Sequence, residues 1–368
     1  MKIALCSDYF YPKIGGITVH VENLAKALEF KGHDVFIVTK KADFDDNIHG
    51  LRVVRVKSLF RTSQTIDIPY TDELMDVFRR EKPDIIHAHH AFSPISLFSL
   101  AIGRRLGIKT VLTNHSIQFL YDVAYLWKPF SYLAFPITQY INYADRILAV
   151  SCAAAKFISH FTDKDVMVIP NGVNVEEFTP SRKDFDGRSI LFVGRLVYRK
   201  GVHRLLNVMR YIVREVEDAH LYMIGSGYLS STIKLMVKSL NLQGNITLIG
   251  SVGREDLIEY YKRSHVFVLP SVYGESFGIV ILEAMASKTP VVAVAQGGIR
   301  ELLENGETGL LVEGEGLTRK LAENICKLLK DKTLSENISL NAYREVQKYD
   351  WKIIARMIEE VYGDILSS

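Results

Sequence analysis

Short runs of apolar residues alternate along the chain with longer segments in which apolar residues recur every three or four positions. The runs IALCS (3–7), DVFIVT (34–39) and DIIHAHH (84–90) are typical of strands. Residues 19–31, between the first two runs, place apolar side chains on one helical face and end before Gly32. This alternation of strands and helices predicts a parallel, doubly wound α/β sheet.

The alternation runs through the chain twice. It breaks at 170–187, a stretch rich in Gly, Pro, Asn and charged residues, and then resumes. We therefore expect two Rossmann-like α/β domains, 1–170 and 187–344, joined by a linker over 171–186 and facing a cleft. A final helix, about 345–368, is expected to pack back on the first domain. Ligands of open α/β sheets bind at the carboxyl ends of the strands, so we expect the functional residues in the loops there.

Composition and charge exclude several classes of protein. The chain has 368 residues, 24% of them charged, and a formal net charge of +3 at pH 7. Because nucleic-acid backbones are bound by a concentrated basic face, this balance argues against a nucleic-acid partner. The apolar run at the N-terminus is too short for a signal peptide, and the longest uncharged window, 85–103, contains three histidines. We expect a cytoplasmic protein and leave open its attachment to a membrane surface.

Two motifs offer groups that suit a phosphate. Gly15 and Gly16 lie between the first strand and the first helix, where the backbone can approach an anion closely; an ordinary tight turn explains them equally well. GRLVYRKG (194–201) follows a strand, and its Arg195 and Lys200 suit a diphosphate, although isolated surface cations are usually solvated.

A third motif, GESFGIVILEA (274–284), holds two glutamates eight residues apart. A helix that begins near Gly278 places Glu283 inside the helix and Glu275 in the loop before it. The N–H groups at the helix start then point at an anion, and a structural ion pair is the plainer alternative. These groups belong to Phe277, Gly278 and Ile279.

Histidines lie within one predicted strand of the first domain and directly after another. His115, in TNHS, comes directly after a strand at the ligand-binding end of the sheet. His87, His89 and His90 are close in sequence, but strand alternation sends neighbours to opposite faces, and no Asp, Glu or Cys nearby completes a ligand set. We expect no bound metal.

The segment 117–144 contains nine aromatic residues, and residues 129–144 carry no charge. Two interpretations stay open. The segment is either a helical hairpin buried against the core or an exposed apolar patch that touches lipid, with Tyr125, Trp127 and Phe130 as the membrane contacts.

Taken together and in this order, the motifs resemble those of the GT-B retaining glycosyltransferases of family 4. The resemblance covers essentially the whole chain and includes the glycine pair, TNHS, PNGV, GRLVYRKG and the E-x7-E of 275–283. Within that family, SDYFYPKIGG, HAHHAFSPIS and TVLTNHS look like the catalytic subunit of phosphatidylinositol N-acetylglucosaminyltransferase, which begins GPI-anchor synthesis.

The resemblance implies roles for the site residues. A nucleotide-sugar would bind mainly to the second domain, with its diphosphate on Arg195 and Lys200 and its ribose hydroxyls on Glu283. Glu275 and the three N–H groups at the helix start would hold the sugar and the distal phosphate. From the first domain, His115 would contact the sugar near its reacting carbon. Gly15 and Gly16 would approach the diphosphate, and the acceptor would enter near Tyr9, Ser116 and Gln118.

The function implied is a retaining, metal-independent transfer of N-acetylglucosamine from UDP-N-acetylglucosamine to an inositol phosphate or inositol phospholipid. The nucleotide-sugar is a co-substrate, and no cofactor is expected. The alternatives are mannosyl or glucosyl transfer from GDP-mannose or UDP-glucose to another acceptor and, less favoured, a sugar-nucleotide epimerase with the same architecture.

Overall fold

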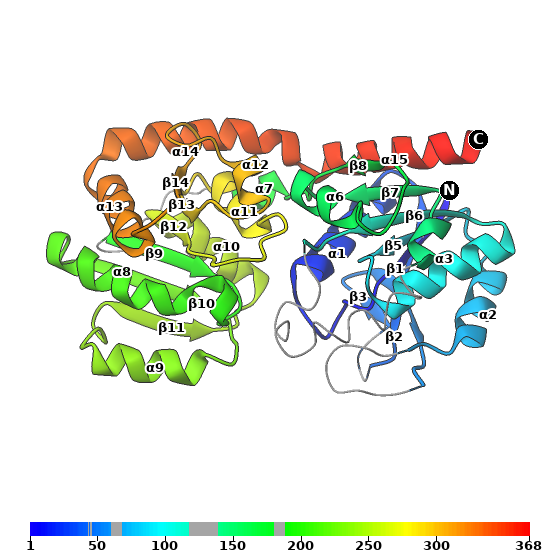
Figure 1. Ribbon diagram of the computed structural model, residues 1–368, viewed down its shortest axis with the longest axis horizontal. Coiled ribbons are helices and arrows are strands. Elements are labelled where there is room, and N and C mark those ends of the chain that lie inside the picture. The colour runs from blue at the N-terminus through cyan, green and yellow to red at the C-terminus, as the bar shows by residue number, and fades with distance from the viewer. Residues whose placement is uncertain (43, 45, 60–67, 118–138, 180–187) are drawn as a thin grey trace. The chain divides into compact units, whose positions relative to one another are not determined.

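The computed structural model describes residues 1–42, 44, 46–59, 68–117, 139–179 and 188–368. The chain divides into two compact units, Met1–Gly172 with Trp351–Ser368, and Val173–Asp350. In each unit a central sheet is covered by helices on both faces (Figure 1).

The first unit is built on an eight-stranded sheet with the order β3-β4-β2-β1-β5-β6-β7-β8. Neighbouring strands are parallel except β3 and β4, which pair antiparallel. The doubly wound sheet expected from the strand–helix alternation is therefore confirmed for this unit. Its strands are β1 (Lys2–Cys6), β2 (Asp34–Lys40), β3 (Asn47–Ile48), β4 (Leu51–Val56), β5 (Ile85–His89), β6 (Lys109–Asn114), β7 (Arg146–Ala149) and β8 (Val166–Val168).

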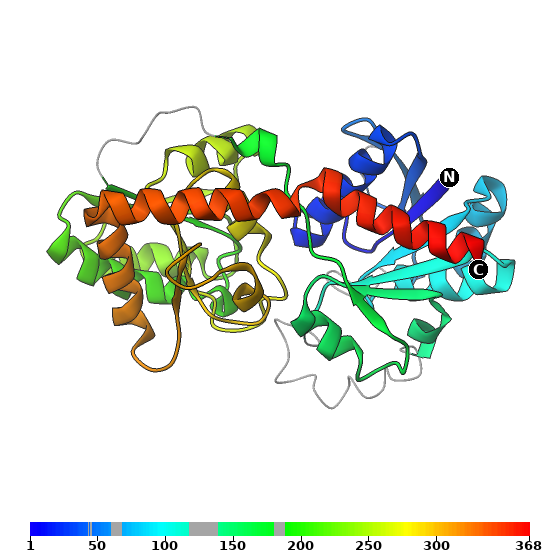
Figure 2. The same ribbon diagram turned by 90° about the horizontal axis from the view of Figure 1, so that it is seen from above.

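Alternation along the strands divides the core of the first unit into two layers. Ile3 and Leu5 of β1 pack with α1 and α15 on one face, whereas Ala4 and Cys6 pack with α2 and α3 on the other. Figure 2 shows α15 lying beside α1. The helices are α1 (Gly16–Phe30), α2 (Thr71–Glu81), α3 (Pro94–Leu106), η2 (Gln139–Tyr143), α6 (Cys152–Ile158) and α15 (Trp351–Ser367).

The second unit contains a six-stranded parallel sheet with the order β11-β10-β9-β12-β13-β14. It repeats the doubly wound arrangement of the first. Its strands are β9 (Arg188–Val193), β10 (Ala219–Ile224), β11 (Ile246–Gly250), β12 (Val266–Leu269), β13 (Val291–Val294) and β14 (Leu310–Val312).

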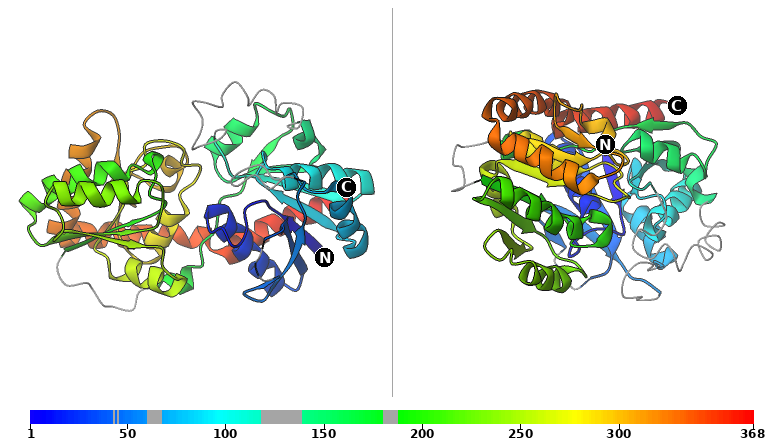
Figure 3. Two further views of the ribbon diagram at one scale, coloured as in Figure 1. Left: turned by 90° about the horizontal axis from the view of Figure 1, so that it is seen from below. Right: turned by 60° about the vertical axis from the view of Figure 1, so that its left-hand side comes forward.

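Amphipathic helices cover this second sheet. In α8, the residues at helical spacing from Val202 through Leu205 and Met209 to Ile212 are buried, so one face of the helix belongs to the core. The right-hand view of Figure 3 shows α8 and α13 side by side in front of the sheet. The helices are α7 (Val175–Phe178), η3 (Tyr198–Lys200), α8 (Val202–Glu215), α9 (Ser230–Ser239), α10 (Arg254–Arg263), α11 (Ile279–Ala286), α12 (Ile299–Leu302), α13 (Leu317–Lys330), α14 (Lys332–Val346) and η4 (Gln347–Tyr349).

The division of the chain differs from the expected boundaries at two places. The stretch 171–186, expected to be a linker, contains α7, whose Val175 and Phe178 are buried in the second unit. This short helix is part of the domain because its two apolar residues are buried, although its glutamates are exposed and the surrounding sequence is polar. The final helix breaks at residues 347–350, so that α15 belongs to the first unit and everything from Val173 to Asp350 to the second.

Among the described residues, no helix is long and apolar enough to cross a membrane.

Candidate functional site

Two loops at the carboxyl ends of β9 and β10 are packed together without room for side chains. A Cβ atom on Gly225 would lie 2.1 Å from the carbonyl oxygen of Gly194, and one on Gly227 would lie 2.3 Å from that of Leu196. The Leu196 N–H also donates to a carbonyl oxygen of the neighbouring loop at 2.9 Å. The charged side chains of the GRLVYRKG segment therefore extend from a backbone that is held on one side.

Lys200 and Glu275 form a buried ion pair in the second unit. Lys200 Nζ contacts Glu275 Oε1, and the two side chains are only 14% and 6% exposed. Arg199 Nη1 lies 3.8 Å from the same carboxylate oxygen. Burial lowers the pKa of the Lys200 ammonium, and the Glu275 carboxylate opposes that shift. The pair thus holds a cation in a poorly solvated place, where its interaction with an anion is strengthened.

Arg199 is a member of this cluster that the sequence reasoning missed. Its Nη1 donates to the Gly274 carbonyl oxygen at 3.3 Å, which anchors the loop that carries Glu275. The available signal was its position beside Lys200 in a motif already singled out for cations. Arg195, which was predicted as a site residue, is exposed. Burial is the main cause that lowers the pKa of Lys200, and the positive charges of Arg199 and Arg195 lower it further. Arg195 is therefore close enough to Lys200 for their charges to interact.

The loop after Glu275 ends in a left-handed turn at the start of α11. Gly278 adopts a φ of +104°, a conformation that favours glycine. The Gly298 N–H donates to the Glu275 carbonyl oxygen at 3.0 Å, and this bond ties the loop to the residue before α12. Within the described part of the chain, three N–H groups at this helix start form no hydrogen bond, as expected of anion donors. They belong to Phe277, Gly278 and Ile279.

Glu283 lies inside α11 and is buried, as the position of Gly278 predicted. The Tyr261 hydroxyl donates to Glu283 Oε2 at 2.9 Å. Burial raises the pKa of Glu283, and the charge of Arg254 and the Tyr261 hydrogen bond oppose this shift. Among the described residues nothing donates to Oε1, so this oxygen is available to a ligand hydroxyl.

Gly15 and Gly16 stand at the start of α1 in the first unit. Gly15 is the extended residue before the helix, and its carbonyl oxygen accepts the Val19 N–H at 3.0 Å. No atom lies within 4 Å of a Cβ built on Gly15, and both glycines are exposed. The backbone here is thus open to close approach.

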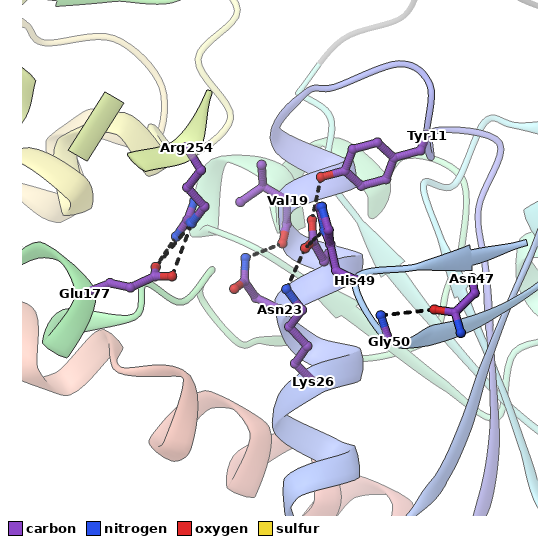
Figure 4. Close-up of polar contacts among 10 residues, drawn as sticks. Tyr11, Val19, Asn23, Lys26, Asn47, His49, Gly50, Glu177 and Arg254 are labelled. Carbon is purple, nitrogen blue, oxygen red and sulfur yellow. Dashed lines mark hydrogen bonds and ion pairs between the residues drawn. The ribbon is translucent and has the colours of Figure 1, made fainter. Parts of the chain in front are cut away.

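A polar cluster joins the side chains of Tyr11, Lys26 and His49 beside α1 (Figure 4), and all three bond the carboxylate of Glu22. The Glu22 carboxylate accepts hydrogen bonds from Tyr11 Oη at 2.8 Å, Lys26 Nζ at 2.7 Å and His49 Nδ1 at 2.8 Å. Burial raises the pKa of Glu22, but these three partners outweigh it and the net pKa is lowered. An ionised Glu22 therefore ties Tyr11, four residues before Gly15, to the helix.

His115 lies in a buried group of histidines that sequence reasoning did not foresee. Its Nε2 is 3.3 Å from His89 Nδ1, and its ring meets that of His20 edge to face at 4.7 Å. His20 comes from α1, and its Nδ1 is 2.7 Å from Asn171 Oδ1. Burial lowers the pKa of His20 to about 4 and those of His89 and His115 well below 6.5, so all three rings are neutral near pH 7.

The same three histidines are the group among the described residues whose ring nitrogens could hold a metal ion. One nitrogen from each lies within 4.8 Å of the others. His20 differs from the histidines singled out in the sequence, His87, His89 and His90, because α1 supplies it from far away in the chain. The absence of a bound metal stays a prediction.

The residues predicted to meet the acceptor lie beside His90. Ser116 Oγ is 2.9 Å from His90 Nε2, and the Tyr9 ring is 5.1 Å from the His90 ring. Ser116 is buried and Tyr9 is partly buried. Gln118 and the predicted membrane contacts lie outside the described residues; these contacts are Tyr125, Trp127 and Phe130.

Two family models match the chain. One, described as Glycosyltransferase Family 4, matches residues 14–177, and the other, Glycosyl transferases group 1, matches residues 174–345. An uncharacterised glycosyltransferase of Methanocaldococcus jannaschii is 30% identical, and the match covers 98% of each chain.

Two further relatives have named activities. A human component of phosphatidylinositol N-acetylglucosaminyltransferase is 29% identical over 99% of this chain and 76% of its own length. A phosphatidyl-myo-inositol mannosyltransferase of Mycobacterium leprae is 27% identical over 100% of this chain and 98% of its own.

Solved structures show the same fold. A sucrose-phosphate synthase from Thermosynechococcus elongatus has a TM-score of 0.82 at 25% identity, covering 100% of this chain and 99% of that one. Anabaena HepE in complex with UDP-glucose has a TM-score of 0.80 at 19% identity, covering 99% of this chain and 100% of that one.

Proposed function

This chain belongs to the GT-B glycosyltransferases, with a family 4 domain followed by a group 1 domain, and on that premise we propose that it moves N-acetylglucosamine from UDP-N-acetylglucosamine to an inositol phosphate or inositol phospholipid. The observation that carries the choice of donor and acceptor is the similarity of the whole chain to the human N-acetylglucosaminyltransferase component. We place the protein in the cytoplasm, in peripheral contact with a membrane.

The second unit supplies the donor site in this proposal. Lys200 and Arg195 hold the diphosphate, while Glu275 and the open N–H groups at the start of α11 hold the sugar and the distal phosphate. The available oxygen of Glu283 accepts from the ribose hydroxyls. A UDP-sugar donor is supported by the fold shared with HepE, whose structure holds UDP-glucose.

The chemistry proposed is a metal-independent transfer with retention. The acceptor hydroxyl oxygen forms a bond to the anomeric carbon on the face from which the diphosphate leaves. The carbon–oxygen bond to the diphosphate breaks with its electron pair on the leaving group, which takes the hydroxyl proton. Because negative charge grows on the diphosphate as that bond breaks, Lys200 and Arg195 stabilise the transition state more than the bound donor.

The first unit supplies His115 to the sugar near its reacting carbon, and the open backbone of Gly15 and Gly16 to the diphosphate. A neutral imidazole suits this place, since a cationic ring would repel the positive charge that develops on the sugar. The acceptor enters beside Tyr9, Ser116 and Gln118.

A second candidate is mannosyl transfer from GDP-mannose to the same class of acceptor. The full-length similarity to the Mycobacterium leprae phosphatidyl-myo-inositol mannosyltransferase supports it. Glucosyl transfer from UDP-glucose and sugar-nucleotide epimerisation follow as weaker candidates.

The test is to incubate the purified protein with UDP-N-acetylglucosamine and phosphatidylinositol and to measure the mass of the lipid. We expect a gain of one N-acetylhexosamine. Parallel reactions contain GDP-mannose or UDP-glucose, soluble inositol phosphate as acceptor, or no acceptor. A hexose gain from GDP-mannose alone replaces the first candidate with the second, and conversion of the donor without acceptor indicates an epimerase.

A further inference from the structure

The buried histidine group connects His115 to residues that the proposed function does not use. His89 and His87 lie two positions apart on β5 and therefore on the same face of the sheet. His115 follows β6, the neighbouring strand, and His20 comes from α1. All four rings lie within the first unit and are at most 7% exposed.

The protons in this group can be assigned from its hydrogen bonds. His89 Nδ1 and His115 Nε2 are 3.3 Å apart, and each neutral ring carries one proton, so one of these nitrogens donates and the other accepts. His89 Nε2 is buried without a partner. If His115 donated, His89 would carry its proton on that unpartnered nitrogen and bury an unused N–H. Donation from His89 avoids this cost, because an unused donor is rarer in protein interiors than an unused acceptor.

We propose that His89 is a positioning residue that donates its Nδ1–H to His115 Nε2, so that His115 carries its own proton on Nδ1 and presents that N–H to the donor sugar. This assignment rests on the proposed function of His115. His115 Nδ1 is not among the buried nitrogens without a partner, and no described residue bonds to it. It is therefore the open edge of the ring.

The C-terminal helix α15 supports the His89–His115 pair through His87. His87 packs against His89 at a centroid distance of 4.2 Å, with the two ring planes tilted by 32°. Its two ring nitrogens are fixed by the Tyr362 hydroxyl of α15 at 2.6 Å and by the Thr113 hydroxyl of β6 at 2.7 Å. With both nitrogens engaged, the His87 ring cannot rotate freely, and the plane of His89 is held against it.

His20 packs against the ring of His115. Asn171 Oδ1 accepts a hydrogen bond from its Nδ1, which leaves Nε2 bare and buried without a partner. The ring packs edge to face against His115 and against Trp351, the first residue of α15. The return of α15 to the first unit thus contributes both Tyr362 and Trp351 to the support of one ring.

The first measurement is the tautomer of His115, read from long-range proton–nitrogen spectra of ring-labelled protein at about pH 7.5, where the rings are neutral. We expect a protonated Nδ1 and a bare Nε2, the opposite of the form that imidazole side chains prefer in water. A protonated Nε2 on His115 in the unaltered protein overturns the proposal, and this result needs no variant and no activity.

The second measurement compares two substitutions of His89. His89→Leu removes the donor, and we expect the protonated Nδ1 form of His115 to be lost and kcat to fall about 10- to 100-fold. The KM for the donor should change by less than about threefold. His89→Asn keeps an amide N–H near the place of Nδ1 and should restore the His115 tautomer and most of kcat. His160→Leu, an exposed histidine outside the site, is the matched control.

A merely structural role of His89 predicts that Leu and Asn are equally harmful, or that kcat falls while the His115 tautomer is unchanged, and either result overturns the proposal. Metal bound to the isolated protein and lost in His20→Ala also overturns it, since a metal would occupy the ring nitrogens. Failure of the proposed function is recognised separately, as no transfer by the unaltered protein while the tautomer is as expected.

Discussion

Lys200 and Glu275 show how one residue determines the chemistry of another. The ammonium is buried and its pKa is lowered, and the carboxylate is the strongest opposing influence. Glu275 therefore keeps Lys200 charged as well as contacting the ligand in the proposed function. Removing one partner of a buried pair leaves the other charge uncompensated, which costs more than the pair itself contributes.

Glu275→Gln tests this coupling. We expect the pKa of Lys200 to fall further, because the favourable charge is lost while burial remains. Transfer should fall about 100-fold or more, since the cation that stabilises the leaving group is weakened. Nucleotide binding should weaken only modestly, and its decline with rising pH should begin at a lower pH than in the unaltered protein.

The matched control for this experiment is Glu323→Gln, an exposed glutamate paired with Arg319 on α13. It should leave both transfer and nucleotide binding unchanged. Full transfer activity in Glu275→Gln would show that the Lys200–Glu275 pair is not part of the donor site.

At the scale of elements, α15 is the segment that joins the end of the chain to the first unit. Trp351 packs over Gly172, where a Cβ atom would lie 2.6 Å from the indole ring. Both residues belong to the first unit. Glycine at this position is required by the close approach of the ring and not by an unusual backbone conformation.

Gly172→Ala should therefore destabilise the first unit by about 1–3 kcal/mol, because the ring and helix must shift to admit one methyl group. Denaturant unfolding measures the effect. Gly244→Ala, at a glycine with nothing within 4 Å of its Cβ, is the matched control and should be close to neutral. A smaller ring partner, Trp351→Leu, should reduce the cost of Gly172→Ala; simple additivity of the two changes would contradict the steric explanation.

A membrane-binding experiment tests the role of the segment 117–144. We predict that Tyr125→Ser with Trp127→Ser weakens co-sedimentation with phosphatidylinositol-containing liposomes while nucleotide binding is unchanged, because interfacial aromatic side chains are lost. The exposed tyrosine pair Tyr211→Ser and Tyr228→Ser in the second unit serves as control. Unchanged co-sedimentation would favour the buried hairpin.

At the scale of the whole molecule, the buried histidines make stability depend on pH. Burial lowers the pKa of His20 to about 4, of His87 to about 3 and of His90 to about 4. Unfolding returns each to about 6.5, so below that pH the unfolded chain binds more protons than the folded one. Their contribution to stability is present above about pH 6.5 and is lost as the pH falls toward their folded values.

We therefore predict that the free energy of unfolding falls steadily between about pH 6.5 and pH 4. Burial raises the pKa of Asp8 to about 6, which acts in the opposite direction, but Asp8 is one group against five buried histidines whose pKa values are lowered. Denaturant unfolding followed at several pH values measures the slope. His90→Gln should reduce it and the exposed His160→Gln should not; equal slopes in all three proteins would contradict the assignment.

Several residues of the proposed donor site stand out in the sequence, and their roles stay predictions. Arg195 and Lys200 stand in a motif that follows β9, the structure brings Lys200 and Glu275 into contact, and the turn at Gly278 determines that Glu283 lies in the helix. Arg199 was missed because the motif does not say which of its cations turns inward. That depends on the loop around Gly274, to which the Arg199 side chain is bonded.

The sequence by itself determined the two doubly wound sheets, because strand and helix periodicities are local and each apolar run must be buried on both faces. Tertiary structure alone decided that His20, His89 and His115 meet, that α15 supports them, and that the stretch after Gly172 folds as part of the second unit. The reason is physical. These contacts join residues tens to hundreds of positions apart, and they form only when whole elements pack, which no local pattern of apolar and polar residues encodes.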